Sequence, residues 1–356
     1  MRSLTALFLL LLSMFLHARA QAQATAVFID RGVSTALVFV DLATGEQHRV
    51  EIEGERFTVV PGAIMLFDTR NRVVELIGAD GRSRQHPFIT LTASESRVDW
   101  AISADGKRIA WTTISGAAPA SITTVTRVAD MNGSNARTVF LETRDDGLRA
   151  KPVAFSPDDT RLYLDYQPDG LDALTVFPQF AGLFELDITA ADPASTFAFL
   201  PGEPGDFTGG GFGGGYFLRL AVSAQSGGFD IKVRQFATDS QTVIPATRGG
   251  GYSIAGDVLI SPDGRYAVYA QAALQGVGSG AAQAETVIMR VDLADMTQSA
   301  LTGPQQGVLR PVAWSEEDAS VILVNPGRAG TWKVRLSDGR IQQIAELTYI
   351  GQITGS

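Results

Sequence analysis

The chain has 356 residues, of which 45% are hydrophobic and 19% are charged, and this composition is typical of a globular protein. Its formal net charge of −9 makes it a poor general binder of nucleic acid, because phosphate would repel it. The sequence contains no cysteine, which excludes disulfides and thiol chemistry. Packing and strand pairing must therefore hold the fold together.

The first two dozen residues have the pattern of a secretory signal peptide. Arg2 gives a positive start, Leu4 to Leu16 is an apolar run of 13 residues, and Ala18-Arg19-Ala20 is a cleavage site of the A-x-A type. The run is shorter than the roughly 20 residues that a membrane-spanning helix needs. We therefore expect a signal peptide over residues 1–24 and a single domain over residues 25–356 that does not span a membrane. Its location would be periplasmic or secreted.

After this segment the chain predicts short strands separated by turns. Alternating apolar residues and turn residues indicate hairpins, and no segment has the sustained 3.6-residue period of a helix. The first predicted strands cover residues 26–29, 36–42, 48–52, 63–67 and 73–77.

A turn motif then recurs along the chain. It is clearest at Ser261-Pro262-Asp263-Gly264. Proline fixes φ, aspartate can bond its own backbone and glycine accepts positive φ, so the flanking apolar stretches form a hairpin. Further copies lie at Ser103 and Ser156, and one with a weaker turn lies at Ser315. Two more strands around a polar turn follow each copy.

The spacing of the turn serines predicts a ring of repeated sheets. Ser103, Ser156, Ser261 and Ser315 are 53, 105 and 54 residues apart, so one copy is hidden in the longest gap. We assign its degenerate turn to residues 223–228. A period near 50 with four strands per unit predicts an all-β fold, a β-propeller of four-stranded antiparallel blades. Seven blades are favoured, and six is the alternative if the first two weak units are one.

Residues 347–353 could supply the strand that closes such a ring. Whether the chain before residue 92 forms complete blades is left open at this point.

These repeats resemble the TolB-like β-propeller family. The resemblance is carried by Ser261-Pro262-Asp263-Gly264, Ser156-Pro157-Asp158, Ser103-Ala104-Asp105-Gly106 and the outer turn at residues 129–137, and it covers roughly residues 92–345. It implies a propeller without the α/β domain that precedes the propeller in TolB, since strands begin directly after the signal peptide. Propeller-bearing peptidases need a following hydrolase domain, and no Gly-x-Ser-x-Gly motif occurs here.

Few residues of this chain point to catalysis or metal binding. The turn aspartates are interpreted as structural, because hairpin chemistry already explains a carboxylate there; they are Asp105, Asp158, Asp263 and Asp318. His48 and His86 are the only histidines after the signal peptide, and they are too few for a His-rich metal site or a serine–histidine relay. We predict no catalytic residue, no bound metal and no cofactor.

The glycine-rich stretch at residues 205–215 is interpreted as a mobile surface loop. A phosphate-cradling loop needs a strand before it and a helix after it, and strands are predicted on both sides here.

The longest insertions are all predicted on one face of the propeller. Residues 115–121, 165–181 and 271–285 join second to third strands, and residues 201–215 join successive blades. Long loops on a rigid scaffold are where binding usually occurs, and aromatic residues often dominate its energy. The candidate binding residues on these loops are Tyr166, Phe177, Phe180, Phe207, Phe212 and Tyr216. Alternatively, some of these rings fold back and cover the blades.

The sequence therefore favours an exported, non-catalytic propeller that binds a protein or peptide partner in the bacterial envelope through its long loops. We expect a monomer that does not bind nucleic acid. The alternative is a lactonase-like propeller hydrolase with a metal in the central channel, and a weaker possibility is carbohydrate binding by the same aromatic residues.

Overall fold

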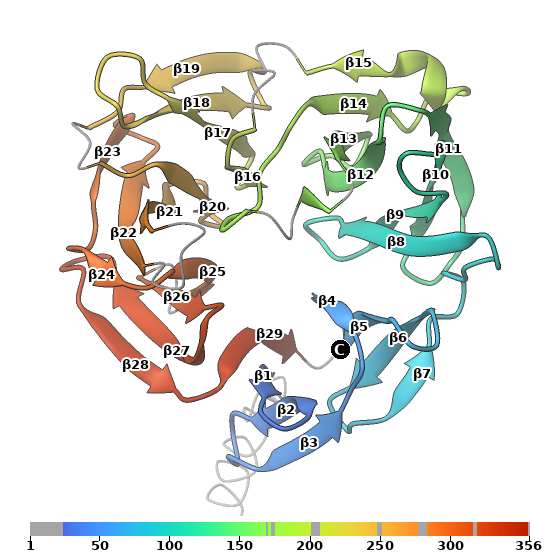
Figure 1. The fold of residues 1–356 in the computed structure, drawn as a ribbon, viewed down its shortest axis with the longest axis horizontal. Coiled ribbons are helices and arrows are strands. Elements are labelled where there is room, and N and C mark those ends of the chain that lie inside the picture. Colours follow the sequence, from blue (N-terminus) through green and yellow to red (C-terminus); the bar gives the residue numbers. More distant parts are fainter. Residues whose placement is uncertain are drawn as a thin grey trace, which may run out of the picture.

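Seven antiparallel sheets form a ring around a central axis (Figure 1), where a propeller has its channel. The structure, a computed structural model, describes residues 24–168, 170–171, 175–200, 207–247, 251–276, 283–315 and 319–354. Each sheet is one blade of a β-propeller and contributes four strands to the ring, as the turn spacing predicts. The signal peptide expected over residues 1–24 lies, apart from Ala24, outside the described residues.

We number the blades from the N-terminus and give the strands of each from the channel outward. Blade 1 consists of β29 (Thr348–Thr354), β1 (Ala24–Arg31), β2 (Thr35–Asp41) and β3 (Gln47–Glu51). Blade 2 consists of β4 (Glu55–Val60), β5 (Ala63–Asp68), β6 (Val73–Gly78) and β7 (Ser83–Gln85). Blade 3 consists of β8 (Glu95–Ile102), β9 (Arg108–Ser115), β10 (Ile122–Asp130) and β11 (Arg137–Arg144). Blade 4 consists of β12 (Leu148–Phe155), β13 (Arg161–Pro168), β14 (Leu183–Asp187) and β15 (Ala198–Phe199).

The remaining blades follow the same order. Blade 5 consists of β16 (Gly210–Gly213), β17 (Tyr216–Val222), β18 (Phe229–Gln235) and β19 (Ser240–Ile244). Blade 6 consists of β20 (Ile254–Ile260), β21 (Tyr266–Gln275), β22 (Gln283–Asp292) and β23 (Thr297–Ala300), with a short fifth strand, β24 (Gln305–Gln306), on β22. Blade 7 consists of β25 (Arg310–Ser315), β26 (Ser320–Asn325), β27 (Arg328–Arg335) and β28 (Ile341–Ala345).

The two ends of the ring meet in blade 1. Strand β29 takes the innermost position and pairs with β1, with Ala24 opposite Thr354. This confirms the expected closing strand at residues 347–353. Residues 24–51 and 55–85 belong to two separate sheets, so the ring has seven blades and the six-blade alternative is wrong.

Blade 5 differs from its prediction. Its first hairpin turn is at Gly214 and Gly215, whereas residues 223–228 join the second strand to the third. The glycine-rich stretch is therefore not a loop over residues 210–213, which form the inner strand β16. The physical reason is close approach to blade 6: a Cβ on Gly211 would lie 2.1 Å from the carbonyl oxygen of Val258 on β20.

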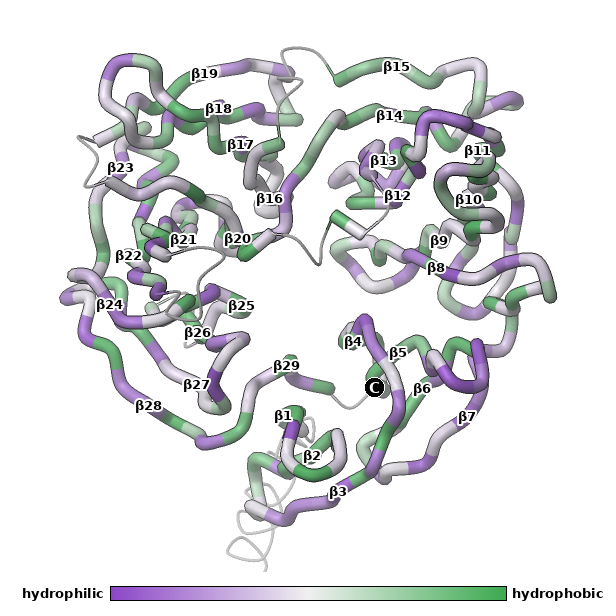
Figure 2. Tube along the Cα trace, in the orientation of Figure 1, coloured by the Kyte–Doolittle hydropathy of each residue, from purple (hydrophilic) through white to green (hydrophobic). Residues whose placement is uncertain are grey.

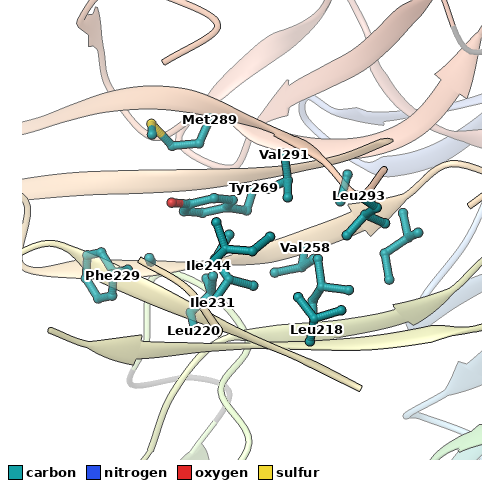
Figure 3. Packing of buried hydrophobic residues seen from close by; sticks show 14 of the residues in the cluster. Leu218, Leu220, Phe229, Ile231, Ile244, Val258, Tyr269, Met289, Val291 and Leu293 are labelled. Atoms are coloured by element: carbon teal, nitrogen blue, oxygen red, sulfur yellow. The ribbon is translucent and has the colours of Figure 1, made fainter. Parts of the chain in front are cut away.

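Apolar side chains pack between neighbouring blades and hold the ring together. Between blades 5 and 6, Leu218 and Ile231 face Val258 and Tyr269, and all four side chains are buried (Figure 3). Several of the outermost strands are polar instead, and hydrophilic residues occur along β3, β7 and β28 at the rim (Figure 2). The blades thus bury their flat faces against each other and leave their outer edges to solvent.

Helix is scarce, as the absence of a helical period predicts. The described residues include one short 3₁₀ helix, η1 (Pro193–Thr196), between β14 and β15. None of the helical structure in the described part of the chain has the length and apolar character to cross a membrane.

Candidate functional site

The propeller has two faces that differ in how the chain turns on them. Turns between the first and second strands of the blades lie on one face, which we call the turn face. Connections between second and third strands, and those between blades, lie on the other face, which we call the long-loop face. In blade 6, β21 and β22 extend together toward this second face.

On the turn face, hydrogen bonds between a serine hydroxyl and an aspartate carboxylate stabilise the repeated hairpins. Ser261 donates its hydroxyl to Asp263 at 2.5 Å, and the backbone N–H of Arg265 donates to the same carboxylate at 2.9 Å. The hydrogen bond from Ser261 lowers the pKa of Asp263. Two more turn aspartates accept a hydrogen bond from the serine two residues earlier, Asp105 and Asp158. Asp318 lies outside the described residues.

On the long-loop face, one segment of blade 4 reaches three other blades. Residues 175–182, which we call the strap, lead into β14 and begin beside β20 (Figure 1). Phe177 of the strap has no exposed surface and packs among side chains of blades 6 and 7, including Val268 and Leu323. A Cβ on Gly256 of β20 would lie 2.4 Å from the Cβ of Phe177, so this approach depends on glycine.

A buried carboxylate holds the end of the strap. Asp165 on β13 accepts hydrogen bonds from the backbone N–H of Ala181 at 3.0 Å and of Gly182 at 2.7 Å. The side-chain amide of Gln167 donates to it at 2.6 Å. Burial raises the pKa of Asp165 to about 6, and these hydrogen bonds oppose the shift.

A buried arginine connects the strap to blade 5. Arg219 on β17 has no exposed surface and donates from Nη2 to the carbonyl oxygen of Phe180 at 3.0 Å. Its Nε donates to the hydroxyl of Thr208 at 2.6 Å. One residue before Phe180, the side-chain amide of Gln179 donates to the carbonyl oxygen of Ala255 on β20 at 3.2 Å. The strap is thus fixed to blades 4, 5 and 6 at once.

Beside the strap, the long-loop face is hollowed between blades 6 and 7. This hollow, which we call the strap pocket, has a volume of about 650 Å³, within the 300–1,000 Å³ range of ligand pockets. The described residues that line it are Thr175, Val176, Ala284, Gln306, Gly307, Val308, Arg310, Asn325, Pro326, Gly327 and Arg328. Other hollows, between blades 1 and 2 and across blades 2 to 4, lie on the turn face.

Two arginines line the strap pocket, and their environments differ. Arg310 donates from Nε and Nη2 to the two carboxylate oxygens of Asp257, at 2.6 and 2.8 Å. Arg328 is exposed, its guanidinium lies 4.7 Å from the centre of the Trp332 ring, and no carboxylate among the described residues forms an ion pair with it. Arg328 therefore contributes a net positive charge, whereas the charge of Arg310 is balanced.

Ion pairs join the inner strands of neighbouring blades. Asp99 on β8 binds Arg56 on β4 and Arg149 on β12, which joins the inner strands of blades 2, 3 and 4. Asp257 joins blade 6 to blade 7 in the same way. No group of three or more His, Cys, Asp or Glu side chains that could hold a metal ion occurs in the described part of the chain.

The structure separates the predicted aromatic residues into several environments. Tyr166 is buried at the end of β13, where its hydroxyl donates to Glu142, and Phe177 is buried in the strap. Phe180 and Phe212 are half-buried and pack edge to face with ring centres 6.2 Å apart. Phe207 remains 49% exposed on the long-loop face.

Tyr216 and Phe212 do not lie on a long loop. Tyr216 begins β17 beside the first hairpin turn of blade 5, so its expected place on the long-loop face is wrong. A Cβ on Gly264 of the turn face would lie 3.2 Å from its ring. Phe212 lies on the inner strand β16, because the chain between blades 4 and 5 is already extended there.

The strap-pocket residues between Gln306 and Arg328 lie outside the predicted long loops and include no aromatic residue. The turn Asn325-Pro326-Gly327-Arg328 joins the second and third strands of blade 7 and is short. Its Asn-Pro-Gly sequence is a turn signal, and its arginine on the long-loop face was the clue available in the sequence.

Comparison with known proteins gives the fold. No family model matches the sequence, and no curated protein sequence matches it. An oligogalacturonate lyase solved with manganese is similar at a TM-score of 0.55, with 10% identity over 92% of this chain and 86% of the other. A Bacteroides uniformis protein named as a 6-phosphogluconolactonase reaches 0.52, with 13% identity over 93% and 99%.

A protein named as TolB from Agrobacterium tumefaciens also has a similar structure. Its TM-score is 0.42, with 12% identity over 80% of this chain and 91% of the other, which is too low to support an argument. At these identities the similarities show a shared propeller fold, and the activities of those proteins are not carried over.

Proposed function

We propose that this chain is an exported, non-catalytic, TolB-like propeller that binds a peptide or protein partner through its long-loop face. The observation that carries the proposal is the strap pocket, because segments of blades 4, 6 and 7 converge there on a hollow of about 650 Å³. A rigid ring that positions such a pocket suits recognition by shape, since little ordering is needed on binding. Export rests on the signal-peptide pattern at residues 1–24.

The alternative, a hydrolase with a metal in the channel, has less support. Such a site needs several oxygen or nitrogen ligands that converge on one point. The inner-strand carboxylates Asp99 and Asp257 are each held by arginine, which competes with a cation for the same oxygens.

The proposal can be tested by the position at which a partner is captured. A photo-crosslinking amino acid is placed at Phe207 or Pro326 on the long-loop face and, as controls, at Pro61 on the turn face or Val243 on the outer strand β19. All four side chains are exposed. The variants are expressed in the bacterial envelope and irradiated. We expect adducts from the first pair and not from the controls, and equal adducts from both pairs would contradict the proposal.

A further inference from the structure

We propose that the strap pocket recognises a carboxylate of a bound peptide through Arg328. This inference rests on the proposed function and names the chemical group that the long-loop face would recognise.

The first step concerns how Arg328 is held. The pairing of β27 with β26 is irregular between Arg328 and Thr331, and across this irregularity the guanidinium of Arg328 lies over the Trp332 ring, so both side chains are on the same side of blade 7. A Cβ on Gly330 would lie 2.6 Å from the Trp332 ring, so glycine leaves room for the indole beneath the guanidinium. Stacking on an aromatic face fixes the plane of the guanidinium and reduces the entropy lost when it binds a planar anion.

The second step concerns charge. The described residues that line the pocket include two arginines and no carboxylate. Among the described residues, Asp257 balances Arg310, so the described part of the lining carries about one net positive charge, in a chain whose formal net charge is −9. A guanidinium can donate two parallel N–H···O hydrogen bonds to the two oxygens of a carboxylate, and the two groups carry one opposite charge each. A phosphate group carries −1.5 to −2 charges and is commonly held by several cations or N–H groups, so a carboxylate fits this lining better.

The third step concerns the rest of the ligand. Val176, Val308 and Pro326 place carbon surface in the same pocket as Arg328. A ligand that satisfies both features has an anionic group next to an apolar one, as at a peptide end or beside an acidic side chain. The carboxylate can therefore come from a chain terminus or from Asp or Glu.

The test uses fluorescein-labelled hexapeptide pools and fluorescence anisotropy with the mature protein. One pool has free C-terminal carboxylates, a second is amidated at the C-terminus, and a third is amidated with Glu and Asp replaced by Gln and Asn. We compare the parent with Arg328→Gln and with Arg335→Gln, an exposed arginine of the same blade on the turn side. Thermal melting is used to verify that each variant is folded.

We expect the parent and Arg335→Gln to bind at least one carboxylate-containing pool about tenfold or more tightly than the third pool, and Arg328→Gln to lose that preference. The preference should also weaken as salt rises. Preference for the first pool alone identifies the chain terminus as the source, and equal binding of the first two identifies acidic side chains.

Equal binding of all three pools, an unchanged preference in folded Arg328→Gln, or no peptide binding at all would overturn the inference. None of these results decides the proposed function, because crosslinking from Phe207 and Pro326 tests the face without reference to Arg328.

Discussion

Asp257 and Arg310 join the inner strands of blades 6 and 7 through two hydrogen bonds, of 2.6 and 2.8 Å. Asp257 lies at a β-bulge in β20 with a φ of +52°, a conformation that non-glycine residues rarely adopt. The bulge turns the carboxylate toward blade 7, where burial raises its pKa and Arg310 opposes the shift.

Removal of Arg310 should leave Asp257 buried without its partner. We expect Arg310→Met to lower the free energy of unfolding by about 3–5 kcal/mol, because an unpaired buried charge is costly. Adding Asp257→Asn should recover much of this loss, since asparagine is neutral and tolerates positive φ. Urea unfolding of the single and double variants measures both effects. In Arg335→Met, where both partners of the ion pair are about half exposed, the loss should stay below about 1 kcal/mol. Similar losses in the two single variants would contradict the prediction.

His86 should make the fold less stable in acid. Its ring is buried, its Nδ1 accepts a hydrogen bond from the backbone N–H of Ile89 at 3.2 Å, and burial lowers its pKa to about 4. Because the pKa is depressed, neutral His86 contributes its full share to the free energy of unfolding above about pH 6.5. This share is lost as the pH falls through 4, a change of about 3 kcal/mol. In His86→Asn, which keeps an acceptor, unfolding free energies between pH 4 and 7 should lack this loss. If the variant and the parent respond alike to pH, His86 is not the source.

Asp165 should change the free energy of unfolding in the opposite direction to His86, over nearly the same range of pH. Its pKa is raised to about 6, so its contribution is present below about pH 3.8 and is lost as the pH rises through 6, by about 3 kcal/mol. Asp165→Asn should therefore gain stability relative to the parent as the pH rises from 4 to 7. Because His86 and Asp165 oppose each other, the pH profile of the parent should be flatter than that of either variant. A steeper parent profile would contradict this account.

Phe177 should anchor the strap against blades 6 and 7. We expect Phe177→Ala to cost about 3–5 kcal/mol, because it removes a fully buried ring among blades 6 and 7. Phe207→Ala removes a ring that is 49% exposed and should cost less than about 1 kcal/mol. Hydrogen exchange should also speed up in residues 175–182 of the first variant. If both variants melt at the same temperature, the strap is not held as we describe.

The blade repeat could be predicted from the sequence because its determinants are local. In the turns at Ser156 and Ser261, the serine and the aspartate bond to each other and to the next few N–H groups, so neighbouring residues specify the hairpin. Blade 5 could not be placed in this way. Its inner strand β16 is rich in glycine because β20 of another blade approaches it, and such a contact leaves no local pattern.

The candidate site was only partly predictable for the same reason. Loop length identified the long-loop face, but an aromatic residue in a loop can be buried or exposed. Phe177 became part of the core of blades 6 and 7, and Phe207 stayed in solvent. The charge balance that distinguishes Arg328 from Arg310 depends on Asp257, which lies 53 residues before Arg310 in the chain.

The pairing of β1 with β29 brings together strands whose paired ends, Ala24 and Thr354, are 330 residues apart. During synthesis or translocation from the N-terminus, the inner edge of β1 stays open until nearly the whole ring has emerged. An open edge can accept the same strand from a second copy, so strand exchange at blade 1 is the misassembly to which this ring is most exposed. Because exchange needs two molecules and closure needs one, dilution should favour closed single rings over linked ones.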